Sequence, residues 1–195
     1  MSVSRTPLTV AVAAAATLLL SACTSGGTSG GGGDTNFVMG KDGISTVEKG
    51  KRTAAPDLSG KTIDGEQLDV AGYRGKVVVL NVWGSWCAPC RAEAPNFQKV
   101  YDDLKADGVQ FVGINTRDTS SKNAVAFDKQ YGITYPSLYD PTGKLMLRFE
   151  KGTLNPQAIP STLVIDREGR IAARSLAALS EDKLRKMISP VLAEK

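Results

Sequence analysis

The chain has 195 residues, of which 42% are hydrophobic and 23% are charged, a length and composition typical of one globular domain. The formal charge of +4 is mild and the basic residues are scattered among acidic ones, which argues against nucleic acid as a partner. Three cysteines with no histidine argue against a zinc site, which as a rule needs four ligands, so we expect neither a metal nor a cofactor.

Residues 1–22 have the pattern of an export signal. Arg5 precedes an apolar run from Leu8 to Leu20, and that length suits a signal peptide better than a membrane span, which needs about 20 apolar residues. The following Leu20-Ser21-Ala22-Cys23 resembles the lipobox of bacterial lipoproteins, in which the cysteine is acylated. The resemblance implies that Cys23 is a lipid anchor at the extracytoplasmic face of the bacterial cell membrane. The alternatives are an ordinary cleaved signal with a leftover thiol and an uncleaved anchor.

A low-complexity segment follows the expected anchor. From Thr24 to Asn36, all residues except Asp34 and Asn36 are Gly, Ser or Thr, so no core can form there. A flexible coil of this length spans roughly 20 Å. We therefore predict three parts: a lipoprotein signal peptide (residues 1–22), an acylated Cys with a flexible linker (23–36), and a folded domain (37–195).

The first part of the folded domain has a mixed pattern. Residues 37–55 show few periodic apolar positions, and we expect only an edge strand with a loop there. Residues 57–70 alternate around turn signals at Ser59-Gly60 and Asp64-Gly65, which favours a β-hairpin. Residues 77–82 form a nearly continuous β-branched run, as in a central strand covered on both faces.

Two cysteines follow the central strand. Gly84 and Ser85 interrupt the apolar run, and Pro89 fits the first turn of a helix, which places Cys87 at the helix N-terminus and Cys90 one turn further in. Unpaired N–H groups at a helix start stabilise a thiolate, so we expect Cys87 to be the nucleophile. Cys90 is then positioned to close a disulfide with Cys87 or to resolve a mixed disulfide. A permanent structural disulfide and half of a zinc site are the alternatives.

The remaining chain alternates between strand and helix patterns, which predicts βαβ units. Apolar residues at helical spacing and capping signals predict helices, and short apolar runs next to turn signals predict strands. The expected elements are a helix over 91–107, a strand over 109–115, a helix over 121–131, a strand over 137–139, a helical turn over 144–151, a hairpin from 163–166 and 170–174, and a final helix from Ser180.

From residue 56 onward, the chain resembles the thioredoxin superfamily, and more narrowly the TlpA/ResA/DsbE-like branch of membrane-associated thiol-disulfide oxidoreductases. The resemblance implies an α/β thioredoxin-like fold, with a central mixed β-sheet flanked by helices, an N-terminal β-hairpin and a central helical insertion. The motifs that carry it are Asp64-Gly65, Gly75-Lys76, Leu80-Asn81-Val82-Trp83, Trp86 to Cys90, Arg91-Ala92-Glu93-Ala94-Pro95, and Ile159-Pro160-Ser161-Thr162 ahead of Leu163-Val164-Ile165-Asp166.

The same resemblance implies roles for residues outside the cysteine pair. Pro160 matches the cis-proline beside the cysteines, with Ile159 presenting its backbone to substrate; an ordinary trans proline is the alternative. Glu93 matches a family glutamate that could relay a proton or raise a thiol pKa, although it could also be a solvated helix carboxylate. Plain thioredoxins carry a buried aspartate where this chain has Asn81, which cannot titrate.

Four further residues in or near the cysteine motif have expected roles. Trp86 and Pro89 are expected to support the active site, and Trp86 could cover the sulfur. Trp83 could do the same or simply pack in the core. Arg91 could favour the thiolate, but a surface charge is the more common role for such a residue.

These observations indicate an enzyme, a membrane-tethered thiol-disulfide oxidoreductase. The resemblance implies cysteine-containing exported proteins as partners, including apocytochrome c in ResA-like members, together with a membrane redox partner, and we expect a monomer. The Pro-x-x-x-Thr-x-x-Cys setting of a thiol peroxidase is absent, as is the histidine of a copper chaperone. The alternative from another class is a non-catalytic, partner-binding lipoprotein. A reductant of apocytochrome cysteine pairs and an oxidant of newly exported proteins would use these same residues.

Overall fold

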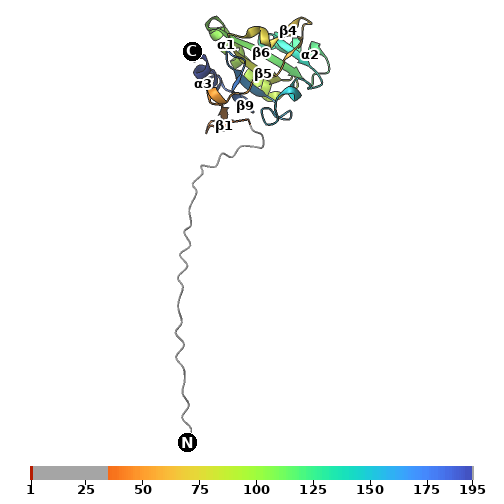
Figure 1. The fold of residues 1–195 in the computed structure, drawn as a ribbon. Helices are drawn as coiled ribbons and strands as arrows, with labels where there is room; N and C mark the ends of the chain where they lie inside the picture. The colour runs from red at the N-terminus through yellow and green to blue at the C-terminus, as the bar shows by residue number, and fades with distance from the viewer. Residues whose placement is uncertain (2–34, 195) are drawn as a thin grey trace.

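A computed structural model describes residue 1 and residues 35–194. Residues 35–194 form a folded unit around one large sheet (Figure 1). The expected signal peptide, Cys23 and most of the expected linker lie outside the described residues. Within the described part, no helix is both long enough and apolar enough to cross a membrane.

The centre of the fold is a seven-stranded mixed sheet in the order β1-β2-β9-β8-β5-β6-β7. Strands β5, β6 and β7 pair in parallel, and the other neighbouring strands pair antiparallel. β5 is central and all seven of its residues are buried, as the β-branched run predicted. The strands are β1 (Val38–Met39), β2 (Ile44–Thr46), β5 (Val77–Trp83), β6 (Val109–Thr116), β7 (Ser137–Asp140), β8 (Ser161–Ile165) and β9 (Ile171–Ser175).

The three α-helices of the described chain pack on one face of this sheet. They are α1 (Ala88–Leu104), α2 (Ser121–Tyr131) and α3 (Glu181–Leu192). Because successive strand residues point to opposite faces, Val77 and Val79 of β5 join the core under α1 and α3. Trp83, on the same face, packs against α2. The connections β5-α1-β6 and β6-α2-β7 are the predicted βαβ units.

The opposite face is covered by irregular segments and a small hairpin. Val78, Leu80 and Val82 point to this side. The predicted hairpin is confirmed: β3 (Ser59–Lys61) pairs antiparallel with β4 (Gln67–Asp69), and β4 leads into the 3-10 helix η2 (Val70–Tyr73). The apolar side chains that pack on this face come from β4 and from the residues that flank the hairpin: Leu68, Leu58 and Val70.

The predicted helices and turns lie where expected, with shifts at their ends. α1 begins at Ala88 with the Cys87 side chain as its N-cap, as the proline in the first turn predicted, and it ends at Leu104, before the expected residue 107. It is followed by the 3-10 helix η3 (Lys105–Asp107) and by Gly108, whose φ of +86° suits a residue without a Cβ. α2 has the expected bounds, and the turn expected within 144–151 is the 3-10 helix η4 (Met146–Arg148).

Residues 37–55 are more ordered than their sequence pattern indicated. β2 pairs with β9 and so extends the sheet, β1 adds an outer strand, and the 3-10 helix η1 (Lys49–Lys51) leads into Arg52. The Arg52 guanidinium is buried and donates to Asp166 Oδ2 at 2.9 Å and to both Glu194 oxygens at 2.7 and 2.6 Å. This ion network joins the first segment of the domain to the β8–β9 turn and to the chain after α3.

We expect Arg52→Met to lower the free energy of unfolding by about 3 kcal/mol, because it leaves the buried Asp166 carboxylate without its cation. Urea unfolding would measure this loss. The neighbouring Lys51→Met is a matched control: its pair with Glu48 is exposed, at 64% and 75%, and should contribute at most about 1 kcal/mol. Equal losses in the two variants would contradict a structural role for the Arg52 network.

Candidate active site

The cysteine pair lies where β5 ends and α1 begins. Cys87 is the N-cap of α1, and its Sγ accepts a hydrogen bond from the Cys90 backbone N–H at 3.2 Å. The two sulfurs form a disulfide of 2.07 Å. In this oxidised state both cysteines are buried, at 3% and 1% exposure, so the helix start does not leave the first sulfur more exposed than the second. The difference between them therefore lies in their positions on the helix rather than in exposure.

A buried carboxylate holds the loop ahead of the cysteines. Asp118, which follows β6, accepts from the Ser85 backbone N–H at 2.9 Å and from the Ser85 hydroxyl at 2.5 Å. It also accepts from the Asn115 amide at 2.6 Å. Because β5 and β6 are parallel neighbours, their carboxyl ends meet at one edge of the sheet, and this carboxylate reaches the active-site loop from there.

Trp86 lies on the surface beside the disulfide, 47% exposed, and its indole N–H donates to the Thr116 carbonyl at 3.3 Å. A Cβ on Gly84 would come within 2.5 Å of the indole nitrogen, so this conformation of Trp86 requires a glycine there. The Arg117 guanidinium lies over the ring, 4.9 Å from its centroid. Trp86 thus forms part of the exposed surface next to Cys87.

The segment before β8 lies next to the disulfide. β8 pairs with β5 along the edge opposite to the one that pairs with β6, so this segment and Asp118 approach the site from opposite sides. The Ile159–Pro160 peptide bond is cis, as the resemblance implied. The Ile159 carbonyl oxygen lies 3.8 Å from Cys87 Sγ, so its backbone borders the expected nucleophile. Pro160 is buried and Ile159 is partly buried.

Glu93 is buried, at 3% exposure, which excludes a solvated helix carboxylate. Its two oxygens accept from the Asn81 amide and from the Leu179 backbone N–H, both at 3.0 Å. Burial raises the pKa of the Glu93 carboxyl to about 7, although the bonds from Leu179 and Asn81 lower it. Glu93 follows Cys90 by three residues on α1, so the two side chains leave the helix on the same side. This places an acid that titrates near neutral pH on the cysteine side of α1.

Three further residues of the motif have clear positions. Trp83 packs in the core, with its ring centroid 4.4 Å from that of Phe127 and its indole N–H donating to Ser137 Oγ at 3.3 Å, which favours its core reading. Pro89 occupies the first turn of α1, where its missing N–H costs no helix hydrogen bond. Arg91 is exposed, and its guanidinium donates to the Ser85 carbonyl.

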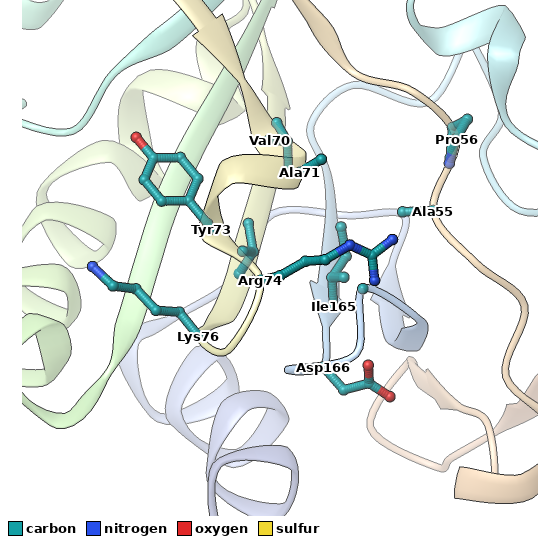
Figure 2. Close-up of a pocket in the computed structure, with 11 residues that line it drawn as sticks. Ala55, Pro56, Val70, Ala71, Tyr73, Arg74, Lys76, Ile165 and Asp166 are labelled. Atoms are coloured by element: carbon teal, nitrogen blue, oxygen red, sulfur yellow. The ribbon is translucent and has the colours of Figure 1, made fainter.

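A small hollow at the opposite end of β5 does not belong to this site (Figure 2). Its walls come from η2, from the first residues of β5 and from the end of β8, and they include Tyr73, Arg74 and Ile165. The cysteines follow the other end of β5. Its volume of about 40 Å³ has room for a water molecule or two and not for a client peptide.

A disulfide at a helix N-terminus, beside a cis-proline and on a mixed sheet, defines a thioredoxin-fold thiol-disulfide oxidoreductase. The chain belongs to the AhpC/TSA family, which it matches over residues 52–174.

The relatives of this chain include several thiol-disulfide proteins. It is 35% identical over 153 residues to the thiol:disulfide interchange protein HelX of Rhodobacter capsulatus, covering 78% of this chain and 81% of that protein. It is 30% identical over 146 residues to the thiol-disulfide oxidoreductase ResA of Bacillus subtilis, covering 74% and 75%. A secreted thiol-disulfide isomerase of Corynebacterium glutamicum superposes with a TM-score of 0.73 at 32% identity, over 78% of this chain and 93% of that one. The chain is therefore a thiol-disulfide oxidoreductase of the ResA/HelX/DsbE type.

Sequence reasoning missed two residues at this site, Arg117 and Asp118. Both follow a buried strand that is the parallel neighbour of β5, and the carboxyl ends of such strands are where sites form in α/β sheets. That rule could have singled out the polar run that ends β6.

Proposed function

We propose that this protein is a membrane-tethered, extracytoplasmic enzyme whose Cys87–Cys90 pair exchanges disulfides with cysteine pairs of exported proteins. The observation that supports this most is the Cys87 sulfur at the start of α1, with the Ile159 backbone 3.8 Å away to receive a client chain. Trp86 and Pro89 support the loop, and Glu93 serves the proton transfer.

The reaction proceeds in two exchanges. In the reducing direction, the Cys87 thiolate attacks a client disulfide, a Cys87–client S–S bond forms, and the second client sulfur leaves as a thiolate. Cys90 then loses its proton and attacks Cys87 Sγ, which re-forms the internal disulfide and releases the client. The client gains two electrons and two protons, and a membrane redox partner of the dithiol type restores the reduced pair. The oxidising direction is the reverse of these steps.

The equilibrium reduction potential of the pair tests this function and its direction. Equilibration of the intact protein with glutathione mixtures, followed by thiol alkylation and mass spectrometry, gives the potential. A value near −270 mV, as in thioredoxin, would support a reductant of exported cysteine pairs, including those of apocytochrome c, and a value near −120 mV would support an oxidant. A pair that stays oxidised under all glutathione ratios and exchanges with no client peptide would contradict the proposal.

We expect Cys23→Ala to release the protein from the membrane fraction while disulfide exchange by the purified protein stays unchanged. The reason is that the expected lipid anchor precedes a linker without apolar residues, whereas the described domain contains both redox cysteines. Membrane fractionation measures the release of the protein, and rates of exchange with a disulfide peptide measure its activity. A protein lacking residues 1–36 that has lost exchange activity would contradict this division.

A further inference from the structure

The exposed charge in contact with the active-site loop is positive. Arg91 and Arg117 are both exposed. Arg91 donates to the Ser85 carbonyl at 2.9 and 2.6 Å, and Arg117 lies over the Trp86 ring. The carboxylate at the same place, Asp118, is buried and accepts from Ser85 and Asn115. A client that approaches the disulfide therefore meets arginine side chains and an exposed indole.

Arg117 adopts a backbone conformation that is unfavourable for its residue type. Its φ is +58°, in the left-handed region that favours glycine. Residues other than glycine that are held in this region are found mostly at functional sites, where surrounding contacts stabilise them. Here the contacts are the stacking on Trp86 and a hydrogen bond from Nη2 to the Pro156 carbonyl at 3.2 Å. Arg117 thus connects the loop before Cys87 to the segment that ends in the cis-proline.

We propose that Arg117, stacked on Trp86, is a specificity-determining residue that binds an acidic side chain flanking the client cysteine. A planar guanidinium has five N–H donors, and the Pro156 bond uses only one of its groups, which leaves donors for a carboxylate. The client sulfur must reach Cys87, the residue after Trp86, and consecutive residues of an extended chain are about 3.3 Å apart. Residues next to the client cysteine therefore pass over Trp86 and Arg117. This inference rests on the proposed function and specifies its substrate class.

The test uses three disulfide peptides that differ only in the residues flanking the cysteine pair, which are Glu, Gln or Lys. Stopped-flow rates of peptide reduction are measured with the intact reduced protein, with Arg117→Gln and with Lys105→Gln. Lys105 is exposed and follows α1 at the end remote from Cys87, roughly 27 Å away at 1.5 Å per residue. Its substitution removes the same charge and so controls for net charge.

We expect the Glu peptide to react about two- to fivefold faster than the Gln peptide with the parent protein and with Lys105→Gln, and the ratio to fall to about one with Arg117→Gln. In the parent protein the preference should also weaken with salt, because the Debye length falls from about 10 Å at 0.1 M to about 3 Å at 1 M. This second measurement needs no variant, so a folding defect in Arg117→Gln does not remove the test.

Equal rates for the Glu and Gln peptides with the parent protein, or an undiminished ratio in a folded Arg117→Gln protein, would overturn the inference alone. Exchange with none of the three peptides would overturn the proposed function and the inference together. A preference that is equally reduced by Lys105→Gln would assign the effect to net charge and would also overturn it.

Discussion

We expect Cys87→Ser to slow disulfide exchange by about 10³-fold or more, and Cys90→Ser to accumulate a mixed disulfide between Cys87 and the client. The reason is the position of the two sulfurs on α1. Cys87 is the N-cap, where helix N–H groups stabilise a thiolate, and the Cys90 N–H already bonds its sulfur at 3.2 Å. Cys90 lies inside the first turn of α1, and we propose it as the resolving thiol.

Incubation of each variant with an oxidised client peptide, followed by mass spectrometry under non-reducing conditions, measures this difference. The parent protein is the control, since its mixed disulfide is resolved and does not accumulate. Adducts found mainly on Cys90 in the Cys87→Ser variant would reverse the two roles.

Glu93→Gln is expected to change both the pH dependence of stability and the rate of the second exchange. Burial raises the pKa of the Glu93 carboxyl to about 7 in the folded protein, whereas the pKa of an unperturbed glutamate is 4.5. Between these pH values the folded state binds more protons than the unfolded state, so stability falls as the pH rises through this window. The loss approaches about 3 kcal/mol above pH 7.

The glutamine variant lacks this loss. Its amide has only one acceptor oxygen for the Asn81 and Leu179 donors, and the missing hydrogen bond costs about 1 kcal/mol. We therefore expect the variant to be about 2 kcal/mol more stable than the parent at pH 8 and about 1 kcal/mol less stable than it at pH 4. Urea unfolding at the two pH values measures this, with the exposed Glu168→Gln as the control.

Although Glu93→Gln is expected to stabilise the fold at pH 8, it is expected to slow the reaction. Without the carboxylate, the Cys90 proton loses its expected acceptor, so resolution of the mixed disulfide should slow by about 10²-fold or more. The apparent thiol pKa should fall at the same time, because a nearby negative charge no longer opposes the thiolate. Stopped-flow resolution rates and thiol titrations test both. If both match the parent while stability changes as described, Glu93 is a structural residue and the proton leaves through water.

Much of the fold follows from local sequence patterns. The helix over 121–131 has the expected bounds, because its N-cap at Ser120 and its end at Gly132 are signals within the segment itself. β5 and the cysteine pair were equally clear, since a continuous apolar run and a proline in the first helical turn depend on a few neighbouring residues. The bound that differed was the end of α1, where Lys105–Asp107 form the 3-10 helix η3 instead of continuing the α-helix.

The burial and pairing of polar residues depended on the tertiary structure alone. Glu93 could be read as buried or solvated until Leu179, 86 positions later, was seen to donate to it. Asp118 bonds Ser85 across 33 positions, and Arg52 bonds Asp166 across 114. Short-range periodicity determines which segments become strands and helices, whereas a buried charge is stable only beside partners that the folded chain brings to it. For this reason the sequence alone predicted the redox cysteines and the strand that carries them, and only the fold decided which charged residues surround them.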